Sequence, residues 1–157
     1  MKEIERLAKQ FRSAIDAAFE NGELRRCYPF SNFPYDCCEH TCDLLGQYLL
    51  ENGIETFQMN GTCKKDESWH HVWLLTKDDI VIDITGDQFI DKLVSEKDVE
   101  AVHVGNEGTI HKIFILNRTP QANTTFTDEN EFTGFAKHPS VRQARLMEVY
   151  EIVRQYL

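Results

Sequence analysis

The spacing of the apolar residues changes once along this chain, and that change does most to limit the fold. Before Gly53 they recur every three or four positions, which predicts amphipathic helices over about 2–20 and 38–51. After Gly53 they alternate with polar residues or form short β-branched runs, which predicts strands. Strands that follow one another without intervening helices favour an antiparallel sheet, so the predicted class is α+β. The expected strands are 54–59, ending in an Asn60-Gly61 turn, then 69–76, 80–85, 101–104 and 109–116, followed by a helix over about 140–157.

Length and charge limit the classes of protein that the chain can belong to. Its 157 residues suit one domain, 1–157, with the functional core expected over about 33–117. Seventeen Lys and Arg against 26 Asp and Glu give a formal charge of −9, which argues against nucleic acids and anionic membranes as partners. No apolar run approaches the ~20 residues of a membrane span, and the charged N-terminus lacks the apolar stretch of a signal peptide. We therefore expect a cytoplasmic protein whose five cysteines are reduced thiols.

Two adjacent cysteines open the second predicted helix, at the end of Phe33-Pro34-Tyr35-Asp36-Cys37-Cys38. A helix N-terminus carries the positive end of the macrodipole, which stabilises a thiolate. Its unpaired N–H groups can bind the oxyanion that forms when a thiolate attacks an acyl carbon. The segment therefore predicts a nucleophile, although a cysteine here can also serve as a small buried apolar residue.

Two titratable residues stand inside the apolar strands. His71 lies in the run Trp69–Leu75, and Asp83 lies in the run Ile80–Thr85. A carboxylate among Ile and Val must be paired or hydrogen-bonded, because burying it without a partner is costly. We expect His71 to be that partner.

The loop between these two strands provides a geometric test of the pairing. In an antiparallel hairpin with the three-residue loop Lys77-Asp78-Asp79, Trp73 stands opposite Asp83 and His71 opposite Thr85. His71 and Asp83 are then diagonal neighbours on one face, with Cβ atoms ~7 Å apart. A two-residue loop would place them on opposite faces. In this arrangement the imidazole can take the proton of a thiol and return it to a leaving amine, while the carboxylate orients the ring.

In this order and spacing, the three segments resemble the papain-like and transglutaminase-like superfamily of cysteine enzymes. The chain is similar to bacterial proteins with the patterns F-P-x-x-x-C, H-x-W-L and I-D-I-T-x-x-Q-F, which read here as Phe33 to Cys38, His71 to Leu74 and Ile82 to Phe89. The resemblance covers about residues 33–89 and implies a helix bearing the nucleophile, packed on an antiparallel sheet. It implies Cys38 as nucleophile, His71 as general base and Asp83 as orienting residue, with no metal or organic cofactor.

Enzymes of this superfamily pass through a thioester. The resemblance therefore implies a hydrolase or deamidase acting on a glutamine or another protein or peptide-like amide, with transglutaminase-type acyl transfer as the alternative. Gln88 is a candidate oxyanion donor or cleft residue, and Trp69 and Trp73 are candidates for an apolar wall beside the histidine. Cys37 is the alternative nucleophile. Cys42 stands where the pattern often has Ser, so its own part in the site is open.

Two other classes of function remain open at this stage. Cysteine and histidine side chains are zinc ligands, so a zinc-supported fold is possible from Cys37, Cys38, His40, Cys42, Cys63, His70 and His71. A protein-binding module without catalysis is the second alternative. We assign no function to His103 and His111, and the polar stretch 117–138 is either a lid or a surface loop.

Overall fold

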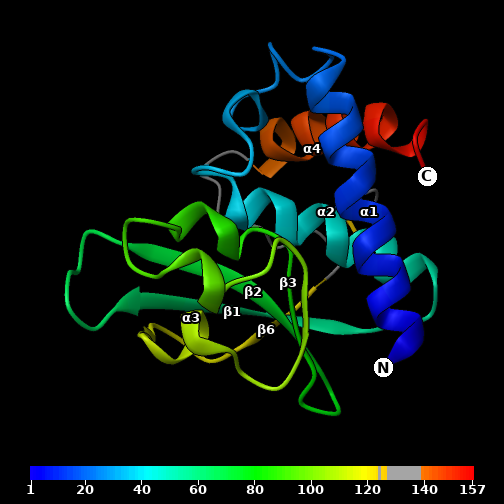
Figure 1. The fold of residues 1–157 in the computed structure, drawn as a ribbon. Coiled ribbons are helices and arrows are strands. Elements are labelled where there is room, and N and C mark those ends of the chain that lie inside the picture. Colours follow the sequence, from blue (N-terminus) through cyan, green and yellow to red (C-terminus); the bar gives the residue numbers. More distant parts are fainter. Residues whose placement is uncertain (124, 127–138) are drawn as a thin grey trace.

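The two N-terminal helices have the bounds that the apolar spacing predicts. In this computed structural model, which describes residues 1–123, 125, 126 and 139–157, α1 spans Lys2–Glu20 and α2 spans Cys38–Glu51 (Figure 1). Gly53 ends α2 with a left-handed φ of 75°, and Gly53 and Ile54 donate N–H groups to the carbonyls of Leu50 and Leu49. A glycine takes this conformation without steric penalty, which makes it the usual residue beyond a helix end.

The strands form one antiparallel sheet in the order β4-β3-β2-β1-β5, with β6 also paired to β1. The fold is therefore α+β, as predicted. The strands are β1 (Thr56–Cys63), β2 (His70–Thr76), β3 (Val81–Asp83), β4 (His103–Gly105), β5 (Phe114–Leu116) and β6 (Gln121–Ala122). Single-turn 3-10 helices, η1 (Phe30–Asn32), η2 (Gly86–Phe89) and η3 (Glu96–Asp98), connect the larger elements.

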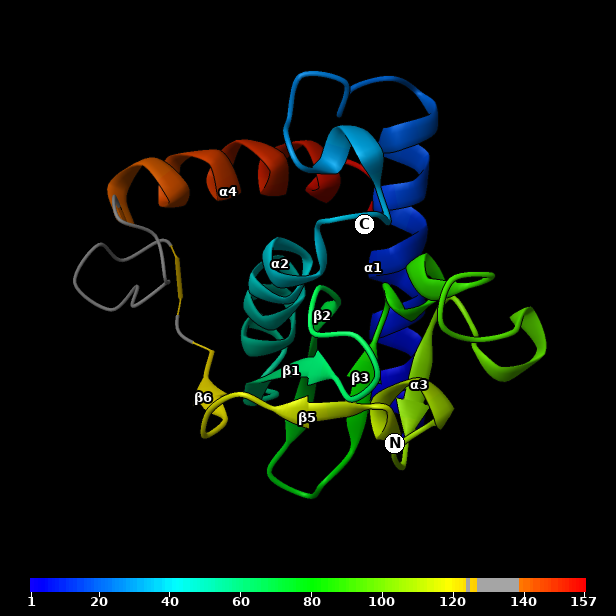
Figure 2. The same ribbon diagram turned by 90° about the vertical axis from the view of Figure 1, so that its left-hand side faces the viewer.

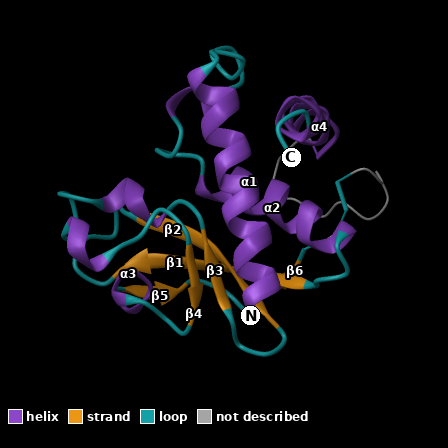
Figure 3. Cartoon of the chain, turned by 45° about the vertical axis from the view of Figure 1, so that its right-hand side comes forward, coloured by secondary structure: helices purple, strands orange, loops and turns teal. Residues whose placement is uncertain are grey.

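Three long helices gather on one side of this sheet (Figure 3). Helix α2 packs on β1 and β2, α1 reaches β4, and α4 (Pro139–Arg154) packs on α1 and α2. Figure 2 shows α2 between α4 and the strands, so α2 is the element that joins the helices to the sheet. None of the helices in the described residues is both long and apolar enough to cross a membrane.

The pairing of β2 with β3 follows the predicted register. Leu74 pairs with Ile82, and Leu75 pairs with Val81. The N–H of Thr76 donates to the carbonyl of Ile80 at 3.0 Å, which leaves the predicted three-residue loop between them. This register sets Trp73 opposite Asp83 and keeps His71 and Asp83 on the same face, because side chains alternate along a strand.

The predicted turn at Asn60-Gly61 is wrong, because β1 continues through both residues to Cys63. Gly61 pairs with His71 on one side and with Leu116 on the other. A Cβ atom at position 61 would lie 2.7 Å from the Cβ of Phe114. The glycine therefore permits the close approach of β5 rather than a turn.

The predicted strand 109–116 is also wrong in its first half. Residues Thr109–Lys112 form the single helical turn α3, and only Phe114–Leu116 form a strand. His111 accepts a hydrogen bond from the N–H of Gly108 through Nδ1 at 3.0 Å, which closes the turn. A short apolar run is compatible with either structure, and here a local side-chain contact decides.

Two further segments differ from the expected strands and loops. The weak strand expected at 101–104 corresponds to β4, which begins two residues later and ends one residue later. The stretch 117–138, predicted to be a lid or a surface loop, contains β6, and its residues 124 and 127–138 lie outside the described residues.

Residues of β2 and β3 alternate between two apolar clusters. Val72, Leu74 and Ile82 belong to the larger cluster, which includes the buried faces of α1, α2 and α4. Trp73 and Val81 belong to a smaller cluster, which the remaining buried residues Met59, Cys63, Phe89, Ile110 and Phe114 complete.

Candidate active site

Cys38 is the first residue of α2, and its side chain is half-buried. The first helical hydrogen bond runs from the N–H of Thr41 to the carbonyl of Cys37, at 2.8 Å. Because N–H groups in the first turn have no intrahelical acceptor, those at the start of α2 are available to an anion. The position therefore offers N–H donors to an oxyanion that forms beside this side chain.

The neighbouring cysteines are poor nucleophiles. The Cys37 side chain is fully buried and donates to the carbonyl of Pro34 at 3.3 Å, and burial raises the pKa of this thiol to about 12. Cys42 is also buried, donates to the carbonyl of Val72 at 3.4 Å, and has its pKa raised well above the ordinary value, first by burial. The structure therefore disfavours Cys37 as the alternative nucleophile. All five cysteines are free of disulfide bonds.

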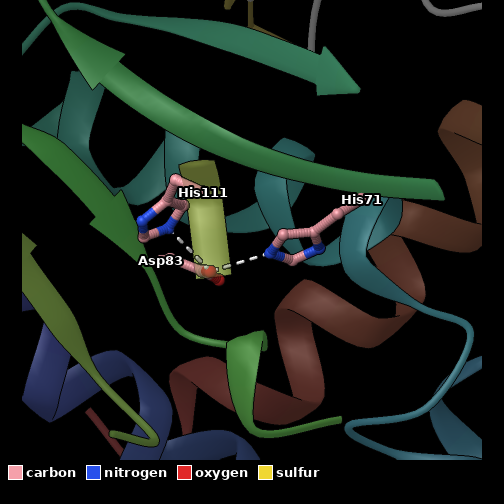
Figure 4. Close-up of side chains that lie close together, drawn as sticks. All are labelled: His71, Asp83 and His111. Atoms are coloured by element: carbon pink, nitrogen blue, oxygen red, sulfur yellow. Dashed lines mark hydrogen bonds and ion pairs between the residues drawn. The ribbon is translucent and has the colours of Figure 1, made fainter. Parts of the chain in front are cut away.

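The expected hydrogen bond between His71 and Asp83 is present. Nε2 of His71 lies 2.7 Å from Oδ2 of Asp83, and both side chains are almost completely buried (Figure 4). The other carboxylate oxygen, Oδ1, accepts the backbone N–H of Thr85 at 2.9 Å. Both oxygens of the carboxylate are thus held by donors from the chain, which fixes the imidazole on one side.

The charges of this pair follow from burial and mutual attraction. Burial lowers the pKa of His71, but the Asp83 carboxylate outweighs it, and the pKa rises to about 10. Burial would raise the pKa of Asp83, yet His71 and His111 hold it far below its usual range. The pair is therefore an imidazolium and a carboxylate at neutral pH.

The second ring nitrogen of His71 is the one left for Cys38. Nδ1 is buried and has no hydrogen-bond partner of good geometry among the described residues. Cys38 nevertheless helps to raise the pKa of His71, through its side chain and its charge. The two groups thus interact electrostatically although no well-aligned hydrogen bond joins them.

A cavity of about 460 Å³ opens beside Cys38. Gln88 and Trp69 both line it, as expected for cleft residues, together with Asp36, Cys38, Glu39, His40, Asn60, Ser68, His70, Val72 and Phe89. Gln88 donates one amide hydrogen to the carbonyl of Thr85 at 2.8 Å, which leaves the second amide hydrogen uncommitted by this bond. Burial, with Arg142 and Arg145, lowers the pKa of His40 to about 4, so its ring is uncharged at neutral pH.

Trp73 is not part of the cavity wall, which corrects the sequence-based expectation. Its side chain is 2% exposed. The indole packs against the rings of His71 and His111, at centroid distances of 5.5 and 5.2 Å. The strand alternation placed Trp73 on the correct face, but β5 and α3 cover this part of that face, through Phe114 and His111.

His111 is the residue of this cluster that sequence reasoning missed. Its Nε2 lies 3.1 Å from Oδ2 of Asp83, the same oxygen that His71 contacts (Figure 4). The signal available in the sequence was a histidine inside the apolar run TIHKIFIL. Interpreting that run as a plain strand concealed it, because the short turn α3 is what aims the ring at Asp83.

The zinc alternative does not fit the arrangement. Within the described residues, the side chains whose ligand atoms lie close enough together to hold a metal are His71, Asp83 and His111. They are not the cysteine-rich set expected for zinc. Nδ1 of His111 accepts a backbone N–H, so the ring hydrogen lies on Nε2. Metal-ligating histidines instead donate their second N–H to an acceptor. A metal at Nε2 would thus require His111 to lose both ring hydrogens.

No protein-family model matches the chain, and neither does any curated protein or any solved structure. The resemblance to papain-like and transglutaminase-like enzymes therefore remains a hypothesis that rests on the motif residues within 33–89.

Proposed function

We propose that this protein is a cysteine-dependent amide hydrolase or deamidase that acts on a glutamine or another protein or peptide-like amide. The observation that carries this proposal is the state of His71. One ring nitrogen is bound to Asp83, and the other is buried and in electrostatic contact with Cys38. A buried imidazolium held in this way is the partner that a thiolate nucleophile needs.

The reaction follows from the positions of these groups. Cys38 reacts as the thiolate paired with the His71 imidazolium, and it attacks the amide carbon, forming an S–C bond. His71 gives its Nδ1 hydrogen to the amide nitrogen as the C–N bond breaks, so ammonia or an amine leaves and a thioester remains. A water molecule then gives one hydrogen to the neutral His71 ring, and its hydroxyl oxygen bonds to the acyl carbon as the S–C bond breaks. The carboxylic acid leaves, and the thiolate and the imidazolium are restored.

Donors for the oxyanion are available in the same cavity. The backbone N–H of Cys38 lies in the first turn of α2, where it has no helical acceptor. Gln88 lines the cavity and can turn its second amide hydrogen toward the oxyanion. These two groups would bind the developing negative charge, as in acyl transfer generally.

Acyl transfer shares the first half of this reaction. If an amine rather than water attacks the thioester, the product is a new amide, which is the transglutaminase reaction. The two outcomes differ only in the acceptor, so they are separated by following ammonia release with and without added primary amine.

The first test is alkylation of the native protein with iodoacetamide from pH 5 to 9, with the modified cysteine located by mass spectrometry. Because the pKa of His71 is raised to about 10, its ring stays protonated over this range. We therefore expect fast labelling of Cys38 that varies little with pH, whereas a free thiol becomes reactive only toward its pKa of ~8.5.

Two variants make the test specific. His71→Ala should slow the labelling of Cys38 at pH 6 by about tenfold or more and restore the pH dependence of a free thiol. Cys37→Ala should leave the labelling unchanged, since that thiol is buried. Slow, unselective labelling of the cysteines in the native protein would overturn the proposal and favour a binding module.

A further inference from the structure

His111 uses both of its ring nitrogens, and their partners determine where its hydrogen lies. The backbone N–H of Gly108 can only donate, so Nδ1 must accept, at 3.0 Å. The single hydrogen of the ring is then on Nε2, which points at Oδ2 of Asp83 at 3.1 Å (Figure 4). His111 is therefore a hydrogen-bond donor of fixed tautomer, and its side chain is fully buried.

The carboxylate of Asp83 is thereby held from several sides. Oδ2 accepts from His71 at 2.7 Å and from His111 at 3.1 Å. Oδ1 accepts the N–H of Thr85, with the Thr85 hydroxyl more distant at 3.4 Å. A carboxylate has about four acceptor positions, so few remain for any other group. Rotation of this carboxylate would break a hydrogen bond to at least one buried partner, which is costly.

Two aromatic rings pack against His111. The ring packs against the rings of Trp73 and His103, at centroid distances of 5.2 and 5.0 Å. His103 donates from Nε2 to the carbonyl of Asn106 at 2.7 Å, which ties down the loop before α3. Among the described residues, the titratable groups around this carboxylate are thus His71, His111, the buried Cys42 thiol and, across the His71 ring, Cys38, with His103 behind His111.

We propose that His111 is a positioning residue, which orients the Asp83 carboxylate toward His71 and takes up part of its negative charge. The role in reactivity rests on the proposed function, whereas the hydrogen bond and its effect on His71 do not. Without His111, the negative charge on Oδ2 of Asp83 would no longer be shared with a second donor, so the His71 imidazolium would hold its proton more tightly. His111 thus limits how strongly Asp83 retains the proton that His71 must give to the leaving group.

The tautomer is tested on the unmodified protein. Two-bond ¹H–¹⁵N correlation spectra at neutral pH distinguish a ring hydrogen on Nε2 from one on Nδ1. We expect the His111 ring to carry its hydrogen on Nε2 and to be neutral. A hydrogen on Nδ1, or a ring with hydrogens on both nitrogens, would overturn the inference without the use of any variant.

The effect on His71 is tested with His111→Leu and His111→Gln. Gln offers an amide oxygen to Gly108 and an amide N–H to Asp83, whereas Leu offers neither. Following the His71 ring signals against pH, we expect the midpoint of deprotonation to rise by about one pH unit, a tenfold change in proton affinity, in the Leu variant. The Gln variant should return it toward the native value.

The alkylation of Cys38 in the same samples separates this inference from the proposed function. An unchanged or lower His71 midpoint in a folded Leu variant, or a Gln variant that behaves like Leu, would overturn the role of His111. If the cysteines were labelled at similar rates while the His71 deprotonation midpoints changed as expected, only the enzyme proposal would be overturned.

Discussion

Among single residues, Asp83 has the most constrained environment in the site. Its side chain is enclosed by His71, His111 and Thr85. Gly86 closes the remaining side, because a Cβ atom there would lie 2.8 Å from Oδ2 of Asp83. The orientation of the carboxylate therefore depends on a residue that contributes no side chain.

Gly86→Ala should displace the carboxylate without removing any charged group. We expect the alkylation of Cys38 at pH 6 to slow by about tenfold and the free energy of unfolding to fall by about 1–3 kcal/mol, as for overpacking. Gly53→Ala is the matched control, because a Cβ at this position meets no atom within 4 Å but its φ of 75° is strained. The control should lose about 1 kcal/mol of stability and keep native alkylation rates. Equal rates in the two variants would contradict this account.

Among the elements, α1 holds the segment that follows Asp83. Arg12 of α1 is 9% exposed and donates to the carbonyl of Ile84 at 2.7 Å and to that of Ala101 at 3.1 Å. The same guanidinium contacts both carboxylate oxygens of Asp87, at 3.1 and 2.9 Å, within η2. One side chain thus links the first helix to the turn between β3 and Gln88, which places Asp83 and Gln88 relative to the helices.

Arg12→Met should remove these contacts while keeping the apolar stem of the side chain. The substitution leaves two carbonyls without their donor and Asp87 without its partner. We therefore expect the free energy of unfolding, measured with denaturant, to fall by about 3–5 kcal/mol. Lys9→Ala is the control on the same helix, because the pair of Lys9 with Glu5 is exposed and should not change stability measurably. If both variants unfolded at similar denaturant concentrations, Arg12 would not be important for stability.

At the scale of the whole molecule, we expect charge to select the reagents that reach Cys38. The net charge is −9, and among the described residues the cavity beside Cys38 is lined by Asp36 and Glu39 but by no Lys or Arg. Glu39 is partly balanced by Arg142 at 3.5 Å, and the Lys92 ammonium lies at the rim, over the rings of Tyr35 and Trp69. Asp36 is therefore the main source of negative potential within the cavity.

A cationic methanethiosulfonate should modify Cys38 faster than its anionic counterpart, by about tenfold at low salt. Raising the ionic strength should reduce this ratio, because exposed charges are screened over about 10 Å at 0.1 M salt. Asp36→Asn should reduce the ratio of the cationic to the anionic rate further. A neutral reagent should react at the same rate with the native protein and with this variant. A ratio near one at low salt would show that the cavity does not select by charge.

The sequence by itself determined the features that depend on local periodicity and chain length. The bounds of α1 and α2 follow from the spacing of apolar residues, and the register of β2 and β3 follows from the length of one loop. That register brings His71 and Asp83 to one face, so their hydrogen bond was predictable from residue numbers alone.

Only the tertiary structure decided which side chains from distant elements complete the cluster. His111 reaches Asp83 because α3 turns beside β3, and Trp73 is covered by β5 and α3 rather than exposed to the cavity. Gly61 lets β5 pack close to β1, although the dipeptide Asn-Gly most often indicates a turn. The physical reason is common to all three. Each depends on packing between segments that are distant in sequence, whereas the pattern of apolar residues reports only which face of each segment is buried.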